Sequence, residues 1–278
     1  MRILILANKD LASLLAINLL LKSAEQHIFS ILLSEKVGQP DSSSSPLTEL
    51  SFFEQTLFND IVLPLSDKAG ENRDRYLDSF ETIKRNGVDL ADIVNINSTD
   101  GLNIVSGIAP DLIVSIRFGQ ILQQPIIDIP ELGVINLHSG ILPNYRGVMA
   151  TFWSMLHGER EIGTTLHFID SNKIDAGSII AIARSEIDYD KSYLHNVLSL
   201  YPQGVRLIVR AIERLAQDER LAAKPLDISL GRYFGLPDRQ ALNTFAEQGH
   251  QLIDYSEIVG FSQWFYQPEK ALKPSGKA

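Results

Sequence analysis

Short, continuous apolar runs that alternate with segments of helical spacing restrict the fold of this sequence more than any other feature. Arg2 to Ala7 is a run of this kind, Asp111 to Ile116 is strongly apolar, and Val134 to His138 is a third expected strand that carries two polar residues. A continuous branched apolar run does not leave one face in water, so it is typical of a strand buried on both faces of a parallel sheet. Because helical segments separate the runs, we predict an α/β fold with a doubly wound, mostly parallel sheet.

The same patterns place the remaining elements. The other expected strands are 27–33, 91–95, 164–169 and 178–183, and the expected helices are 10–23, 98–108, 148–157, 193–217 and 238–248. Asp10 is expected to cap the first helix, and the longest helix is expected to break near Pro202 and Gly204. Residues 37–47 indicate a polar loop, whereas 49–85 show little clear periodicity.

Length and composition bound the organisation of the chain. With 278 residues it can bury enough surface for one large domain and a small appendage. We predict a catalytic-type domain at 1–217 and a small C-terminal extension at 218–278, in which Gly231–Leu236 is a hypothetical edge strand of a homodimer. The sequence has no cysteine, which excludes disulfides, a thiolate zinc site and a cysteine nucleophile. No spacing of His, Asp and Glu suggests a metal site.

Charge and hydropathy limit the partners. The 25 basic and 34 acidic residues give a net charge of −9, and no basic run offsets it, so the protein's field repels nucleic acid. The apolar start at 1–7 is too short for a signal peptide, and the run Leu11–Leu21 is too short for a membrane span. We therefore predict a cytoplasmic protein with no nucleic-acid and no membrane partner. The turn at 7–10 has no glycine, which argues against a dinucleotide site.

Two polar side chains stand at the end of the third apolar run. Asn136 and His138 are two residues apart, so strand alternation places them on one side, where ligands of open parallel sheets bind. An amide N–H aimed at an acyl oxygen stabilises a developing oxyanion by about 3 kcal/mol, and an imidazole transfers protons near neutral pH. Asp175 could fix the histidine tautomer or take a proton from an attacking amine. The alternative is structural, with Asn136 and His138 bonded to loop backbone and Asp175 forming the turn before Gly177.

The loop after this strand carries a family resemblance. The block 136–147 reads Asn-x-His-Ser-Gly-Ile-Leu-Pro-x-Tyr-Arg-Gly, and Asp175-x-Gly177 lies downstream. This pattern resembles the folate-dependent formyltransferase family, which includes glycinamide ribonucleotide, methionyl-tRNA and nucleotide-sugar N-formyltransferases. The likeness extends from Pro110 to Ile180 and is weaker elsewhere.

The resemblance implies a reaction and a set of site residues. It makes Asn136, His138 and Asp175 the catalytic trio and N10-formyltetrahydrofolate the formyl donor, with its pterin between loops 117–122 and 170–176. The implied donor-binding residues are Arg117, Phe118, Gly119, Ile121, Leu122, Ser139, Gly140, Ile141, Lys173 and Ile174. The sequence departs from the family pattern in a loop 170–175 that is one residue longer, and in Ser139-Gly140 where Pro-Ser or Ser-Ser is commoner.

Three further side chains have competing interpretations. Arg117 is either a partner for a folate carboxylate or pterin carbonyl, or a member of a surface ion pair. Arg146 is expected to brace its loop rather than to contact substrate. His167 is expected to be a hydrogen-bonded core histidine.

Several functions fit this pattern. The first hypothesis is an N-formyltransferase for the primary amine of a small acceptor, with an amino-sugar nucleotide as first choice and hydroxyornithine or a carrier-bound amino acid as alternatives. Methionyl-tRNA is disfavoured because the chain is acidic and the segment after 217 is short for an RNA-binding barrel. A ribonucleotide is disfavoured because the N-terminal loop lacks phosphate-binding glycines. The second hypothesis is a formyltetrahydrofolate hydrolase, and the third is a folate or metabolite binder without catalysis.

Overall fold

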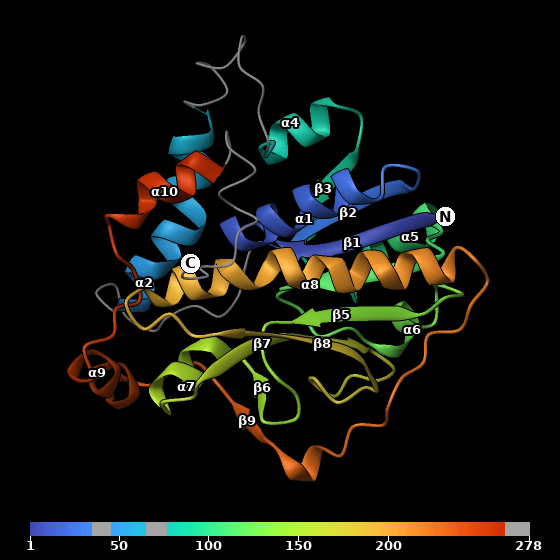
Figure 1. The fold of residues 1–278 in the computed structure, drawn as a ribbon. Coiled ribbons are helices and arrows are strands. Elements are labelled where there is room, and N and C mark those ends of the chain that lie inside the picture. The colour runs from blue at the N-terminus through green and yellow to red at the C-terminus, as the bar shows by residue number, and fades with distance from the viewer. Residues whose placement is uncertain (35–45, 65–76, 265–278) are drawn as a thin grey trace.

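The structure is a computed structural model that describes residues 1–34, 46–64 and 77–264. Within these ranges, seven strands form one sheet with the order β3-β2-β1-β4-β5-β7-β8 (Figure 1). The strands are β1 (Arg2–Asn8), β2 (Ile28–Ser34), β3 (Asp89–Asp92), β4 (Leu112–Ile116), β5 (Val134–His138), β7 (Glu161–Phe168) and β8 (Ile179–Glu186). Strands β3, β2, β1, β4 and β5 are parallel, whereas β7 and β8 run antiparallel to their neighbours. The predicted α/β fold with a mostly parallel sheet is confirmed.

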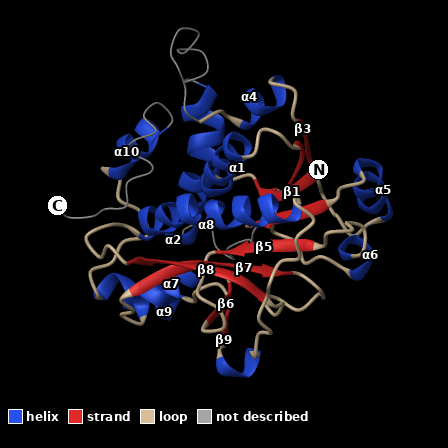
Figure 2. Ribbon diagram, turned by 45° about the vertical axis from the view of Figure 1, so that its right-hand side comes forward, coloured by secondary structure: helices blue, strands red, loops and turns tan. Residues whose placement is uncertain are grey.

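Helices cover both faces of the sheet. They are α1 (Leu11–Ser23), α2 (Pro46–Ser51), the π-helix η1 (Phe52–Val62), α4 (Phe80–Arg85), α5 (Thr99–Ile108), α6 (Gln124–Ile127), α7 (Ala150–Leu156), α8 (Tyr193–Leu215), the 3-10 helix η2 (Ile228–Leu230), α9 (Arg239–Glu247) and α10 (Glu257–Trp264). Helices α1 and α8 lie on one face, and α5 and α6 lie on the other (Figure 2). Strand β1 shows why the run at 2–7 is continuously apolar. Ile3 and Ile5 pack in the core under α1 and α8, whereas Leu4 and Leu6 pack in the second core.

Helix α8 corrects one prediction. It continues without a break from Tyr193 to Leu215, although Pro202 lies inside it. Its long buried face packs against the sheet and against α1, and this packing offsets the hydrogen bond that proline cannot make. Gly204 is a contact point and not a breaker, because a Cβ there would lie 2.9 Å from Leu137 Cδ2 and 3.0 Å from Thr164 Oγ1.

Other boundaries differ by a few residues. Strand β3 occupies 89–92 and not 91–95, and β7 begins three residues before the predicted start at 164. The predicted cap of α1 is confirmed, since Asp10 Oδ1 accepts from the Ser13 N–H at 2.8 Å. Most of the loop predicted at 37–47 lies outside the described residues.

The described part of the C-terminal segment packs on the main body. Strand β9 (Arg232–Phe234), within the segment predicted as a dimer edge, pairs in parallel with β6 (Tyr145–Gly147) of the same chain. Phe245 of α9 stacks on Phe152 of α7 at 4.5 Å between ring centroids. No helix within the described ranges is long and apolar enough to span a bilayer.

Candidate active site

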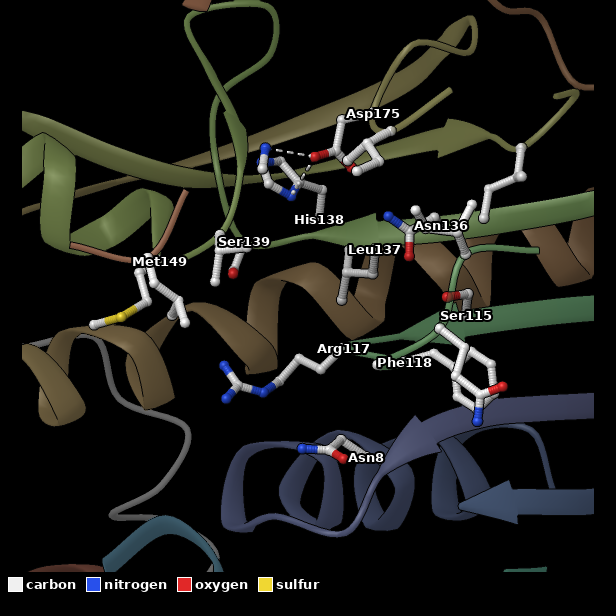
Figure 3. Close-up of a pocket in the computed structure, with 18 of the residues that line it drawn as sticks. Asn8, Ser115, Arg117, Phe118, Asn136, Leu137, His138, Ser139, Met149 and Asp175 are labelled. Atoms are coloured by element: carbon white, nitrogen blue, oxygen red, sulfur yellow. Dashed lines mark hydrogen bonds and ion pairs between the residues drawn. The ribbon is translucent and has the colours of Figure 1, made fainter. Parts of the chain in front are cut away.

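A cavity of about 400 Å³ opens at the carboxyl ends of β4 and β5, where the topology predicts ligand binding (Figure 3). Its lining comes from the strand ends and following loops within 115–122, 136–139, 147–149 and 167–175, from residues within 47–55 and 233–236, and from Asn8 and Tyr193. This volume is within the usual range for a small-molecule site. Asn136, His138 and Asp175 all line it, although 37 residues separate His138 from Asp175 along the chain.

His138 stands at the end of β5 and is buried. Its Nε2 lies 2.6 Å from the carbonyl oxygen of Tyr145, which can only accept, so Nε2 carries a hydrogen. Its Nδ1 lies 3.5 Å from Asp175 Oδ2. Both ring nitrogens therefore face acceptors.

Gly140 keeps this histidine in place. A Cβ at Gly140 would lie 2.5 Å from His138 Nε2 and 2.7 Å from the Tyr145 carbonyl oxygen, so any side chain would displace the bond between them. Gly140 and Ile141 are not among the described residues that line the cavity, although the sequence predicts that they bind the donor. The requirement for glycine here comes from packing around His138.

Asp175 occupies a turn with φ of 47°, a left-handed conformation that aspartate tolerates better than most residues. Its Oδ2 accepts from the Gly147 N–H at 2.8 Å. Burial by itself raises the pKa of Asp175, but the charge of His138, the hydrogen bond and charge of His167 and the Gly147 N–H outweigh it and lower the pKa to about 2. The carboxylate is therefore ionised at neutral pH.

His167 is part of this group, which the sequence did not reveal. It lies directly opposite Asn136 in the antiparallel pairing of β5 with β7 and is only 1% exposed. Its Nδ1 bonds the Phe168 carbonyl oxygen at 2.8 Å, and its Nε2 lies 3.1 Å from Asn136 Nδ2 and 3.5 Å from Asp175 Oδ1. It is a hydrogen-bonded buried histidine, as predicted, but it connects two members of the site.

Arg146 braces the loop that carries Asp175, as predicted. Its Nη2 donates to the Ile174 carbonyl oxygen at 2.7 Å, and its Nε donates to the same oxygen at 3.3 Å. Strand β6 therefore holds the Asp175 turn at two adjacent points, through the Arg146 side chain and the Gly147 backbone.

Arg117 forms an ion pair, but the pair is inside the protein and not at the surface, and its role in donor binding stays a prediction because it also lines the cavity. Its Nε donates to Asp10 Oδ2 at 2.9 Å, and its Nη2 lies 3.3 Å from Glu54 Oε1. Burial raises the pKa of Glu54 to about 7 even though Arg117 opposes this shift, whereas the two carboxylates raise the pKa of Arg117 despite its burial. Glu54, a cavity residue from the segment without clear periodicity, was not predicted.

The two loops predicted to hold the pterin face the same cavity. One loop contributes Phe118, Gly119, Ile121 and Leu122 to the lining, and the other contributes Lys173 and Ile174. Ser139, which follows β5, also lines the cavity. The mixture of apolar side chains and loop backbone groups fits a flat heterocycle with polar edges. Among the described residues, no group of three or more His, Asp or Glu side chains is arranged to hold a metal ion.

These features define an α/β protein with a polar trio in a ligand cavity at the strand ends. Residues 82–212 match the sequence profile described as Formyl transferase. A methionyl-tRNA formyltransferase from Citrifermentans bemidjiense is 34% identical over 146 residues, which make up 52% of this chain and 45% of that protein. One from Syntrophus aciditrophicus is 37% identical over 134 residues, or 48% of this chain and 42% of that protein. The chain thus spans less than half the length of these curated relatives.

Solved structures share the fold over most of the chain. A sugar N-formyltransferase from a Shewanella species has a TM-score of 0.56 and 18% identity, covering 87% of this chain and 79% of that one. Glycinamide ribonucleotide transformylase 1 from Symbiobacterium toebii has a TM-score of 0.55 and 16% identity, covering 82% and 94%. An N-formyltransferase from Helicobacter canadensis, solved with folinic acid and dTDP-3-aminofucose, has a TM-score of 0.53 and 19% identity, covering 87% and 72%. The match of residues 82–212 to this profile and the similarity to the curated relatives confirm the resemblance to the formyltransferase family seen in the sequence.

Proposed function

We propose that this protein is an N-formyltransferase that moves a formyl group from N10-formyltetrahydrofolate to the primary amine of a small acceptor. The observation that carries the proposal is the convergence of Asn136, His138 and Asp175 in one cavity, between two loops that fit a pterin. When bound, the donor supplies an activated formyl group. The chain has to stabilise negative charge on the formyl oxygen and remove one proton from the amine.

Asn136 is suited to the first task. Its Nδ2 lies 3.1 Å from His167 Nε2, and a contact at this one point leaves at least one of the two amide hydrogens for a ligand in the cavity. His167 is thus a positioning residue for Asn136. His138, two residues further along β5 and at the same cavity, adds a second polar group beside the formyl oxygen.

Asp175 is suited to the second task because it is an ionised carboxylate at the same cavity. As the amine nitrogen bonds to the formyl carbon, the amine becomes acidic and Asp175 accepts its proton, directly or through water. The bond between the formyl carbon and N10 breaks, and N10 takes up a proton. The products are a formamide and tetrahydrofolate.

An amino-sugar nucleotide remains our first choice of acceptor. Its support is the shared fold with sugar N-formyltransferases and the bound dTDP-3-aminofucose of the Helicobacter canadensis enzyme. The two sequence relatives named above are methionyl-tRNA formyltransferases, so methionyl-tRNA belongs in the test as a competing acceptor. The net charge of −9 disfavours it.

The test is turnover of N10-formyltetrahydrofolate with an amino-sugar nucleotide, ornithine derivatives and methionyl-tRNA, with the formylated product identified by mass spectrometry. Substituting His138→Ala should lower kcat by at least about a hundredfold, because it removes a polar group beside the formyl oxygen and a partner of Asp175. His27→Ala, outside the cavity lining, is the matched control and should leave kcat unchanged. Equally fast deformylation without any amine would identify a hydrolase instead. Unchanged turnover in His138→Ala would refute the assigned site.

A further inference from the structure

One wall of the catalytic cavity comes from the C-terminal segment. Tyr233 and Leu236 line the same cavity as the polar trio, together with Gly147 and Met149. Tyr233 is 53% exposed and Leu236 is 40% exposed. We call these four residues the C-terminal wall. An exposed aromatic ring and an exposed leucine in a cavity leave apolar surface that a ligand can cover.

The strand that carries Tyr233 is firmly fixed. Arg146 and Tyr233 are paired residues of β6 and β9, and the Val148 N–H donates to the Phe234 carbonyl oxygen at 2.8 Å. The Phe234 ring lies between two others, with centroids 5.5 Å from Tyr145 and 5.1 Å from Trp153. The Trp153 indole N–H also donates to the Gly235 carbonyl oxygen at 3.1 Å. A ring held on such a strand loses little freedom when a ligand binds to it.

The Tyr233 ring lies next to the residue that holds the catalytic carboxylate. A Cβ on Gly147 would lie 2.9 Å from Tyr233 Cε2, so the ring covers the backbone of Gly147. The N–H of that glycine is the donor to Asp175 Oδ2. A group resting on Tyr233 is therefore one residue away from the carboxylate that accepts the amine proton.

Of the two loops predicted to hold the pterin, the one at 170–176 adjoins this wall through Gly147 and Asp175, whereas the one at 117–122 lies away from it. Figure 3 shows Met149 and Phe118 on opposite sides of His138, with Ser139 next to Met149. A ligand on the Met149 side therefore lies across His138 from the donor loop at 117–122, which leaves that side of the cavity open to an acceptor.

The chemistry of the wall indicates which acceptors it fits. None of its four described side chains is charged, and the cavity's described basic lining residues outside the trio and His167 are Arg117 and Lys173. Arg117 is paired with Asp10 and Glu54. The wall therefore recognises an apolar face rather than an anion, and an aromatic ring prefers flat partners.

We propose that Tyr233 and Leu236 form the acceptor subsite, and that the acceptor carries its primary amine on or beside a ring whose apolar face packs on Tyr233. The proposal rests on the formyltransferase function above. It excludes linear amines such as ornithine derivatives as the preferred acceptors. A sugar ring and a nucleotide base both offer such a face, and the experiment separates them.

The experiment measures binding and turnover for the wild type, Tyr233→Ala and Tyr233→Phe. The probes are dTDP-3-aminofucose, glucosamine, dTDP alone and ornithine, with binding measured by calorimetry without donor and turnover measured with N10-formyltetrahydrofolate. We expect ring-bearing amines to be preferred over ornithine, and Tyr233→Ala to raise their KM by about tenfold with the donor KM unchanged. Tyr233→Phe should retain the wild-type KM because it keeps the ring. Loss of glucosamine binding but not of dTDP binding in Tyr233→Ala identifies the sugar as the group on the ring, and the reverse identifies the base.

The binding measurement without donor distinguishes a failure of this proposal from a failure of the proposed function. Ring-bearing probes that bind through Tyr233, in a protein that transfers no formyl group, would leave the subsite standing and refute the transferase. Transfer to amines with a KM that Tyr233→Ala leaves unchanged would refute the subsite alone. Preference of the wild type for ornithine would also overturn it.

Discussion

Asp175 shows how much a single side chain depends on its partners. It is buried in a left-handed turn, yet its carboxylate is ionised because Gly147, His138 and His167 surround it with donors and positive charge. Each of these partners comes from a different element. The arrangement that holds the carboxylate in its ionised form also links it to the stability of the fold.

The low pKa of Asp175 has a measurable consequence for stability. Its pKa falls from 3.8 in the unfolded chain to about 2 in the folded protein. The ionised group therefore stabilises the fold fully at pH values above the pKa of the unfolded chain. This stabilisation is lost as the pH falls through the pKa of the folded protein. The full contribution is about 2 kcal/mol, of which about 1 kcal/mol is lost by about pH 3. Urea unfolding at about pH 5 and pH 3 should show that the free energy of unfolding decreases less between these pH values in Asp175→Asn than in the wild type.

Asp92→Asn is the control for this measurement, because Asp92 is exposed on β3. Its unfolding free energy should follow the wild type across the same pH range. An equal decrease in the free energy of unfolding on acidification in Asp175→Asn and the wild type would show that the carboxylate is not held as the structure indicates.

The contact of α8 with the sheet depends on one glycine. Glycine normally weakens a helix, but Gly204 lets α8 approach β5 and β7 at Leu137 and Thr164. Gly107 in α5 lacks this role, because a Cβ added there would meet no neighbouring atom within 4 Å. The two glycines are therefore a matched pair with opposite expected responses to alanine.

Gly204→Ala should lower the free energy of unfolding by about 1 kcal/mol, because overpacking at a buried contact exceeds the gain in helix propensity. Gly107→Ala should raise it by up to about 1 kcal/mol. Chemical denaturation of both variants at neutral pH measures the difference. A stabilising effect of Gly204→Ala would mean that α8 stands further from the sheet than the structure shows.

The hydrophobic core extends beyond the residues predicted for the catalytic-type domain. Phe245 and Phe261 of the C-terminal segment are buried in the same core cluster as α1 and α8. Strand β9 also pairs with β6 beside the active site. The described part of the segment thus contributes both to the core and to the cavity, and the boundary at 217–218 remains a prediction.

Phe245→Ala should therefore lower the free energy of unfolding by about 3 kcal/mol or more, as expected for a buried aromatic residue that is stacked on Phe152. Leu230→Ala in the same segment is the control, because Leu230 is 72% exposed and its loss should change stability by less than about 0.5 kcal/mol. Thermal unfolding followed by circular dichroism would compare the two. Equal, small effects would show that the segment folds apart from the main core.

The sequence by itself determined the fold class and the identity of the polar trio. Continuous apolar runs leave no choice but a strand buried on both faces, and the two-residue spacing of Asn136 and His138 fixes their common side. The Asn-x-His pattern and the Asp-x-Gly pattern then carried the family resemblance. These are local properties, and so they can be read without knowing which segments meet.

Only the tertiary structure decided what surrounds the trio. His167 joins the site through the register of β7 on β5, and Tyr233 joins it through the pairing of β9 with β6, neither of which a local pattern specifies. Arg117 is paired inside the protein because Asp10 and Glu54 reach it from distant segments. Helix α8 stays whole because packing on the sheet outweighs the local effect of Pro202. Long-range contacts set these outcomes, because their energies exceed the local preferences that a sequence displays.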